Sequence, residues 1–204
     1  MHISEGVLAP AVLGAGAALA AAGMAVGLRR LDYDRLMTVA LLSAAFFVGS
    51  LIHVPVGPGS VHLILNGLLG AVLGWAAFPS IFVALLLQAL LFQFGGFTVL
   101  GVNTFNMAMP AVLGGLCCRP LIRRGGKARL AGAFCCGAGA VAGAALLTSL
   151  SLAWTDEGFV QAACLLLAAH LPVMLAEGVI TMLVVGFLAR VQPDILSFSA
   201  NSHG

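Results

Sequence analysis

The first two residues, Met1-His2, carry nitrogen donors that could bind one metal ion together. The α-amine, the first backbone amide nitrogen and a second-position imidazole can all reach one ion as fused chelate rings. Such donors suit late divalent transition metals, and one more imidazole, such as that of His62, would complete the four-nitrogen square that Ni(II) and Cu(II) favour. The alternative is that Met1 is only the initiator residue and that His2 lies in a frayed terminus.

The composition is that of an integral membrane protein. Of the 204 residues, 61% are hydrophobic and only 8% are charged, whereas a soluble domain has about 25% charged residues. The length would hold about seven spans if each takes roughly 20 residues plus short connections. We therefore predict an all-α integral membrane protein with about seven transmembrane helices and no water-soluble domain.

Hydrophobic runs and helix breakers divide the chain into expected spans. A turn rich in Pro and Gly is expected at 54–60, Pro79 should separate the third and fourth spans, and Pro172 should divide the last region, 159–189, into a short leading helix and a spanning helix. The stretch 95–106 is too polar for lipid contact. It is expected to have an irregular backbone that is buried in the protein or lines a cavity. The expected spans are 8–28, 36–53, 62–78, 80–94, 107–122, 130–154 and about 173–190.

The basic residues predict the orientation of the chain. If the first span runs from outside to inside, all nine Lys and Arg residues fall on the cytoplasmic side, which is a positive-inside pattern. The N-terminus is then outside and the C-terminus inside. The same orientation places His2, His53 and His62 at the outer face with Glu5, so a single metal site assembled from outside is geometrically possible.

Some polar residues are candidates for the surroundings of this site. Asn66 is expected one helical turn after His62, on the same face of the helix. His53 could be a ligand, a hydrogen-bond donor to a ligand or an interfacial residue. Glu5 could orient the His2 imidazole or attract cations.

Four further polar residues are expected at or within the membrane. Asn103 and Asn106 favour hydrogen bonding in a folded loop over ligation, and Gln88 is expected to bond between helices. Glu177 is an intramembrane carboxylate, which makes it either a functional residue or a neutral or paired helix-packing residue. The motifs HExxH, GxxxxGK[ST] and GxSxG are all absent from the sequence. Uphill transport would therefore need a partner or an ion gradient.

Several stretches of the sequence carry a resemblance to a known family. They are MHISEGVL at the start, VPVGPGSVHLILNG around His62, LLLQALLFQFGGFTVLGVNTFNM from Leu85 and AHLPVMLAEGVITMLVVGFLARVQPDIL from Ala169. The chain resembles the CbiM/NikM family, the substrate-binding (S) components of energy-coupling factor (ECF) transporters for cobalt and nickel. The resemblance implies a seven-helix protein of a prokaryotic cytoplasmic membrane, with the N-terminal segment tucked into the bundle. There the Met1 amine, the amide and imidazole of His2, and the His62 imidazole would hold the metal.

The resemblance also implies partners. These are a transmembrane coupling protein of the CbiQ/NikQ type, ATPases of the CbiO/NikO type and often a small CbiN/NikN-like subunit, with no nucleic acid. Many relatives replace His53 with another residue, so ligation is not transferred to it. The expected domain plan is a single transmembrane substrate-binding domain, 1–204, with a metal-binding segment at 1–7, a helical bundle at 8–190 and a cytoplasmic tail at 191–204.

We expect capture of Ni²⁺, or Co²⁺, at the outer face and no enzymatic activity in this chain. Planar four-nitrogen coordination favours nickel, although the family handles both metals. The alternative is a self-sufficient metal channel, or a membrane metalloenzyme in which Glu177 and the outer histidines act on a substrate.

Overall fold

The computed structural model describes residues 2–51 and 62–196 with their side chains, and residues 53–56 and 59–61 by their backbone. The described residues form seven α-helices and one short antiparallel hairpin, joined by 3₁₀ turns at Tyr33–Arg35, Gly74–Ala76 and Glu157–Phe159 and followed by one at Pro193–Leu196. The elements are α1 (Pro10–Arg29), α2 (Leu36–Gly49), β1 (His53–Val56), β2 (Gly59–His62), α3 (Asn66–Leu73), α4 (Ala77–Phe92), α5 (Leu100–Arg124), α6 (Gly126–Thr155) and α7 (Val160–Val191).

The helices have the length and the surface of a membrane protein. Large apolar side chains point outward on α7, where Leu175, Leu183 and Phe187 are 61–63% exposed, and lipid would cover such a surface. The predicted membrane architecture is confirmed, with the hairpin as its one departure from an all-helical chain within the described residues. The number of seven spans stays a prediction, because the stretches that are long and apolar enough to cross a membrane are Pro10–Arg29, Asn66–Phe92, Leu100–Arg124, Gly126–Thr155 and Glu157–Val191.

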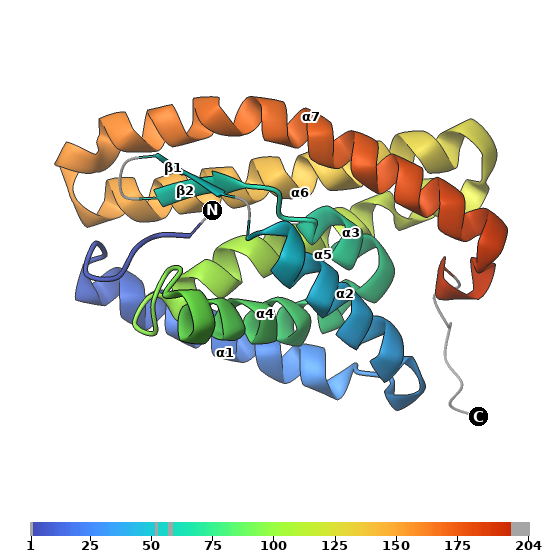
Figure 1. Cartoon of the computed structure of the whole chain (residues 1–204), viewed down its shortest axis with the longest axis horizontal. Coiled ribbons are helices and arrows are strands. Elements are labelled where there is room, and N and C mark those ends of the chain that lie inside the picture. The colour runs from blue at the N-terminus through green and yellow to red at the C-terminus, as the bar shows by residue number, and fades with distance from the viewer. Residues whose placement is uncertain (1, 52, 57–58, 197–204) are drawn as a thin grey trace.

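The long helices α6 and α7 lie side by side along one side of the molecule (Figure 1). Helices α1, α2 and α4 lie on the other side, and α3 and α5 fill the space between the two groups. Close approach is possible where small residues meet: a Cβ on Gly70 of α3 would lie only 1.8 Å from the Ala111 carbonyl oxygen of α5, so these two helices touch backbone to backbone.

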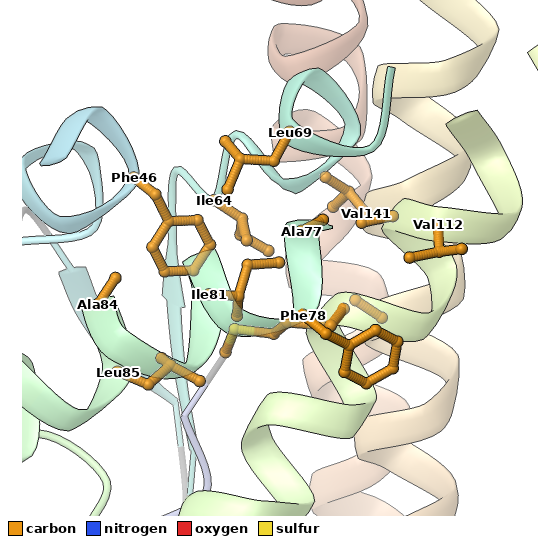
Figure 2. Close-up of a cluster of buried hydrophobic side chains, with 14 of the residues drawn as sticks. Phe46, Ile64, Leu69, Ala77, Phe78, Ile81, Ala84, Leu85, Val112 and Val141 are labelled. Atoms are coloured by element: carbon orange, nitrogen blue, oxygen red, sulfur yellow. The ribbon is translucent and has the colours of Figure 1, made fainter. Parts of the chain in front are cut away.

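The apolar core joins five helices and the loop before α3. Figure 2 shows Ile64 of this loop among side chains from α2, α3 and α4, including Phe46, Leu69 and Ile81. All four side chains are completely buried. The loop that follows β2 is therefore anchored in the centre of the protein.

The third expected span begins later than predicted. Strands β1 and β2 pair antiparallel, His53 with His62 and Val56 with Gly59, so His62 ends a strand and Asn66 begins α3. The expected relation of Asn66 to His62 by one helical turn is therefore wrong. Pairing between these two strands satisfies their backbone hydrogen bonds locally.

Two prolines do not break helices where we expected. The break between α3 and α4 lies at Gly74, whose φ is +59°, while Pro79 is the third residue of α4, where a proline removes only an N–H that has no partner within the helix. Pro172 lies inside a continuous α7. Prolines are tolerated in this way in membrane helices because neighbouring groups can satisfy the freed backbone carbonyl.

The polar stretch 95–106 is a loop only in its first part. Helix α5 begins at Leu100, so Asn103 and Asn106 lie on a helix. Both side chains are buried, which agrees with the expectation that this segment avoids lipid.

The basic residues gather at one end of the bundle. They lie at the ends of α1, α5 and α7 and at the starts of α2 and α6, and Arg35 Nη2 donates to the Ile195 carbonyl oxygen at 2.5 Å. At the opposite end, the Ala9 amide donates to Thr155 Oγ1 of α6 at 3.4 Å. The N-terminal segment therefore lies away from the basic residues, as the positive-inside pattern requires, and the orientation in the cell stays a prediction.

Candidate metal site

The N-terminal segment, residues 2–9, enters the bundle and is held there by Asn103. The Ile3 amide donates to Asn103 Oδ1 at 3.0 Å, and Asn103 Nδ2 donates to the Ile3 carbonyl oxygen at 3.2 Å. This side-chain amide thus supplies the donor and acceptor that a neighbouring strand would offer. The Ile3 side chain is completely buried beside Val102 and Leu152, so the segment is not a frayed terminus.

Two adjacent glycines form a second contact with this segment. The Glu5 amide donates to the Gly95 carbonyl oxygen at 3.0 Å, and the Thr98 amide donates to Glu5 Oε1 at 3.2 Å. Gly95 and Gly96 have φ values of +77° and +140°, and a Cβ on Gly96 would lie 2.5 Å from Glu5 Oε2. Only glycine suits both the backbone conformation and this close approach. We did not predict from the sequence that Gly95 and Gly96 hold the N-terminal segment, although a pair of glycines in a polar stretch indicates a close backbone approach.

The contact that brings the two predicted imidazoles together is a ring stack. The centroids of the His2 and His62 rings are 4.7 Å apart, with 22° between the ring planes, and the residues are only 5% and 3% exposed. Burial above all, then the charge of the N-terminal amine and then the charge that His2 can carry, hold the pKa of His62 well below its usual 6.5. His62 is therefore neutral at physiological pH, which is the form that binds metals.

Hydrogen bonding assigns the tautomer of His62. Its Nδ1 lies 2.9 Å from the Leu63 carbonyl oxygen, and a carbonyl only accepts, so Nδ1 carries the proton. Nε2 then keeps a free lone pair, and this buried atom has no hydrogen-bond partner among the described residues. Metal-binding histidines commonly show this arrangement, in which the second ring nitrogen donates to a carbonyl or a carboxylate.

Glu177 of α7 contacts the loop that carries His62 into α3. Its Oε1 accepts hydrogen bonds from the amides of Ile64 and Leu65, the second at 2.6 Å. Leu65 has a φ of +56°, a left-handed conformation that persists only where the surroundings impose it. The Glu177 side chain is completely buried.

Three other predicted residues join helices to one another. Asn66 Nδ2 donates to backbone carbonyls of α5 at 3.2 Å and α6 at 3.3 Å. Asn106 Nδ2 donates to Ser151 of α6 at 3.1 Å, and Gln88 of α4 donates to Ser50 at the end of α2. These hydrogen bonds tie the bundle together, and none of them involves His2 or His62.

Met1 and the side chain of His53 lie outside the residues that the structure describes. The His53 backbone pairs with that of His62 in the hairpin. Within residues 2–51 and 62–196, no three His, Cys, Asp or Glu side chains are grouped closely enough to hold a metal ion. A complete ligand set around His2 and His62 therefore requires other donors, such as backbone nitrogen.

Residues 2–195 match the family model of CbiM, described as the cobalt uptake substrate-specific transmembrane region. The chain belongs to the CbiM family.

Relatives of this CbiM-family chain are named for metal transport. It is 47% identical to a Haemophilus influenzae protein named as a presumed metal transport protein, over 98% of this chain and 99% of the relative. It is 31% identical to an Archaeoglobus fulgidus protein named as a presumed fused nickel transport protein NikMN, over 98% of this chain and 69% of the relative.

The fold also matches a solved structure. A crystal structure of a transition metal transporter superposes with a TM-score of 0.80 at 30% identity, and each chain is covered completely. The CbiM-family chain is thus a multi-pass membrane protein of a cobalt and nickel transport family, and the resemblance seen in its sequence is confirmed. The names of these relatives favour a transport protein over the metalloenzyme alternative.

Proposed function

We propose that this CbiM-family chain captures Ni²⁺, or Co²⁺, at the outer face of a prokaryotic cytoplasmic membrane as the S component of an ATP-driven ECF importer. The observation that carries the proposal is the buried contact between His2 and His62. The ligands are the Met1 amine, the amide nitrogen and imidazole of His2, and His62 Nε2. Residues 1–7 form the metal-binding segment of one transmembrane unit, with the bundle at 8–190 and a cytoplasmic tail at 191–204.

The held N-terminal segment supports this assignment. Chelation by an amine, a backbone amide and an imidazole needs a fixed backbone, and the two hydrogen bonds between Asn103 and Ile3 fix it directly after His2. The donor set is all nitrogen and tetragonal, which favours nickel over harder cations. Glu5 is exposed on the same segment, where its charge attracts cations.

The partners follow from the energy that uphill uptake requires. We infer a CbiQ/NikQ-like coupling protein, CbiO/NikO-like ATPases and a small CbiN/NikN-like subunit. The name NikMN of the Archaeoglobus fulgidus relative describes a fused protein, which supports the small subunit as a neighbour of this chain.

Transport in liposomes tests the S component role. We expect the purified chain alone to bind Ni²⁺ without accumulating it, and the chain with its coupling protein and ATPases to accumulate Ni²⁺ only when ATP is present. An ATPase variant unable to hydrolyse ATP is the control. Accumulation or rapid equilibration of Ni²⁺ by the single chain would contradict the proposal and favour the channel alternative.

The pH dependence of binding tests the ligand set. The lowered pKa of His62 leaves its Nε2 unprotonated throughout the neutral range, whereas the Met1 amine and the His2 amide must each lose a proton to bind metal. Each released proton raises the affinity about tenfold per pH unit. We therefore expect the Ni²⁺ affinity to rise at least about tenfold per unit from about pH 6 to pH 7.5, measured by competition with a chelator of known affinity. A flat profile would exclude the amine and amide as ligands.

A further inference from the structure

A continuous series of hydrogen bonds leads from α7 to the imidazole of His62. Glu177 Oε1 accepts from the Ile64 amide, and the Leu63 carbonyl oxygen accepts from His62 Nδ1 at 2.9 Å. The Ile64 N–H and the Leu63 C=O belong to the same peptide unit, in which they point in opposite directions. One planar peptide therefore connects the carboxylate to the histidine.

This arrangement resembles the second shell of many metal sites. There a carboxylate accepts the ring proton of a ligating histidine, which fixes the ring and makes the ligating nitrogen more basic. Here a peptide lies between the two groups. A carboxylate at its N–H end polarises the peptide, strengthens the carbonyl as an acceptor, and so strengthens the hydrogen bond from Nδ1.

We propose that Glu177 is a positioning residue for the His62 ligand and that it acts through the Leu63–Ile64 peptide. The inference rests on the proposed function, because it assigns a role toward the metal that His62 binds. It also gives α7 a direct connection to the site, so movement of α7 relative to the hairpin would change the strength of metal binding.

The contact with Ile64 separates this role from ordinary helix capping. Leu65 is the N-cap residue of α3, so its amide belongs to the helix terminus, whereas the Ile64 amide lies before the cap and belongs to the loop. The carboxylate therefore holds the connecting loop. Oε1 accepts both hydrogen bonds, and these two N–H donors offset part of the cost of burying the carboxyl group, whose Oε2 has no hydrogen-bond partner among the described residues.

The test compares variants that keep the acceptor but change the charge. Glu177→Gln leaves one oxygen to accept from both amides and removes the negative charge. We expect the Ni²⁺ affinity to fall about 10–100-fold. The visible absorption band of the Ni²⁺-saturated variant should also move to lower energy, because a less basic imidazole is a weaker ligand. The unfolding midpoint of the metal-free variant should stay close to that of the wild type.

Two further variants keep the outcome decisive. Glu177→Asp retains the charge at a greater distance from the amides and should bind Ni²⁺ with an affinity between those of the wild type and Glu177→Gln, so it replaces the glutamine variant if that protein does not fold. Thr181→Val is the matched control, since Thr181 is another completely buried polar residue of α7, and it should bind like the wild type.

The possible results divide clearly. Wild-type affinity and spectrum in Glu177→Gln, together with loss of binding in His62→Ala, would overturn the proposal and leave the proposed function intact. A lower affinity with an unchanged spectrum and a lowered unfolding midpoint would show a purely structural role and would also overturn it. Absence of Ni²⁺ and Co²⁺ binding in the wild type would refute the proposed function itself.

Discussion

An extension of the chain before Met1 is expected to lower the Ni²⁺ affinity by at least about 100-fold, because losing a ligand should cost more than the roughly 10–100-fold that follows loss of a second-shell group. The added peptide bond turns the free amine into an amide and removes it from the chelate. The segment cannot compensate by sliding outward one residue, since Ile3 is completely buried and held by Asn103 on both its amide and its carbonyl. A shift of one residue would place a different side chain in the buried position that Ile3 occupies beside Val102 and Leu152.

The matched control for the extension is the same protein after cleavage directly before Met1. Isothermal titration with Ni²⁺ before and after cleavage should show binding only after the native terminus is restored. The same tag placed at the C-terminus should leave the affinity unchanged. If the uncleaved protein binds Ni²⁺ as tightly as the cleaved protein, the Met1 amine is not a ligand.

Replacing His62 with alanine is expected to have an effect of similar size, again at least about 100-fold. The replacement removes the buried Nε2 that has no hydrogen-bond partner among the described residues. It also leaves the His2 ring without its stacked neighbour. Ni²⁺ binding should be measured by titration, and an X-ray absorption spectrum of any remaining complex should show fewer nitrogen ligands.

His170 of α7 provides a matched control for His62. It is also completely buried, its Nδ1 lies 2.7 Å from the Leu166 carbonyl oxygen, and its Nε2 has no partner among the described residues. His170→Ala therefore removes a side chain of the same kind, and we expect Ni²⁺ binding to be retained with a loss of stability of about 1–3 kcal/mol or more from the cavity. If His170→Ala abolishes binding and His62→Ala does not, the site has been assigned to the wrong histidine.

The sequence could predict the membrane class and the donor chemistry because both are local properties. Apolar runs bounded by basic residues indicate spans whatever packs against them. The donors of Met1 and His2 are adjacent along the chain, so their ability to chelate one ion does not depend on the fold. The pairing of this segment with His62 was a weaker prediction, since it required two distant segments to share one membrane face.

Helix-breaking residues predicted the helix boundaries less well than the nitrogen atoms of Met1 and His2 predicted the chemistry of the site. Gly74, and not Pro79, marks the break between α3 and α4, and α7 continues through Pro172 without a break. A proline in the first turn of a helix, or in a helix whose neighbours satisfy the freed carbonyl, costs little. The environment that decides this cost is formed by other helices.

Tertiary structure alone decided how the site is held. The hydrogen bonds between Asn103 and Ile3 join residues 100 apart in sequence, and the contact between Glu177 and Ile64 joins residues 113 apart. No periodicity or spacing predicts such pairs, because each polar group only needs some partner once it is buried, and packing selects which one. The sequence by itself determined which atoms could bind a metal ion. The fold determined which of them are buried together, since burial and the hydrogen bonds that burial requires arise only when the helices pack.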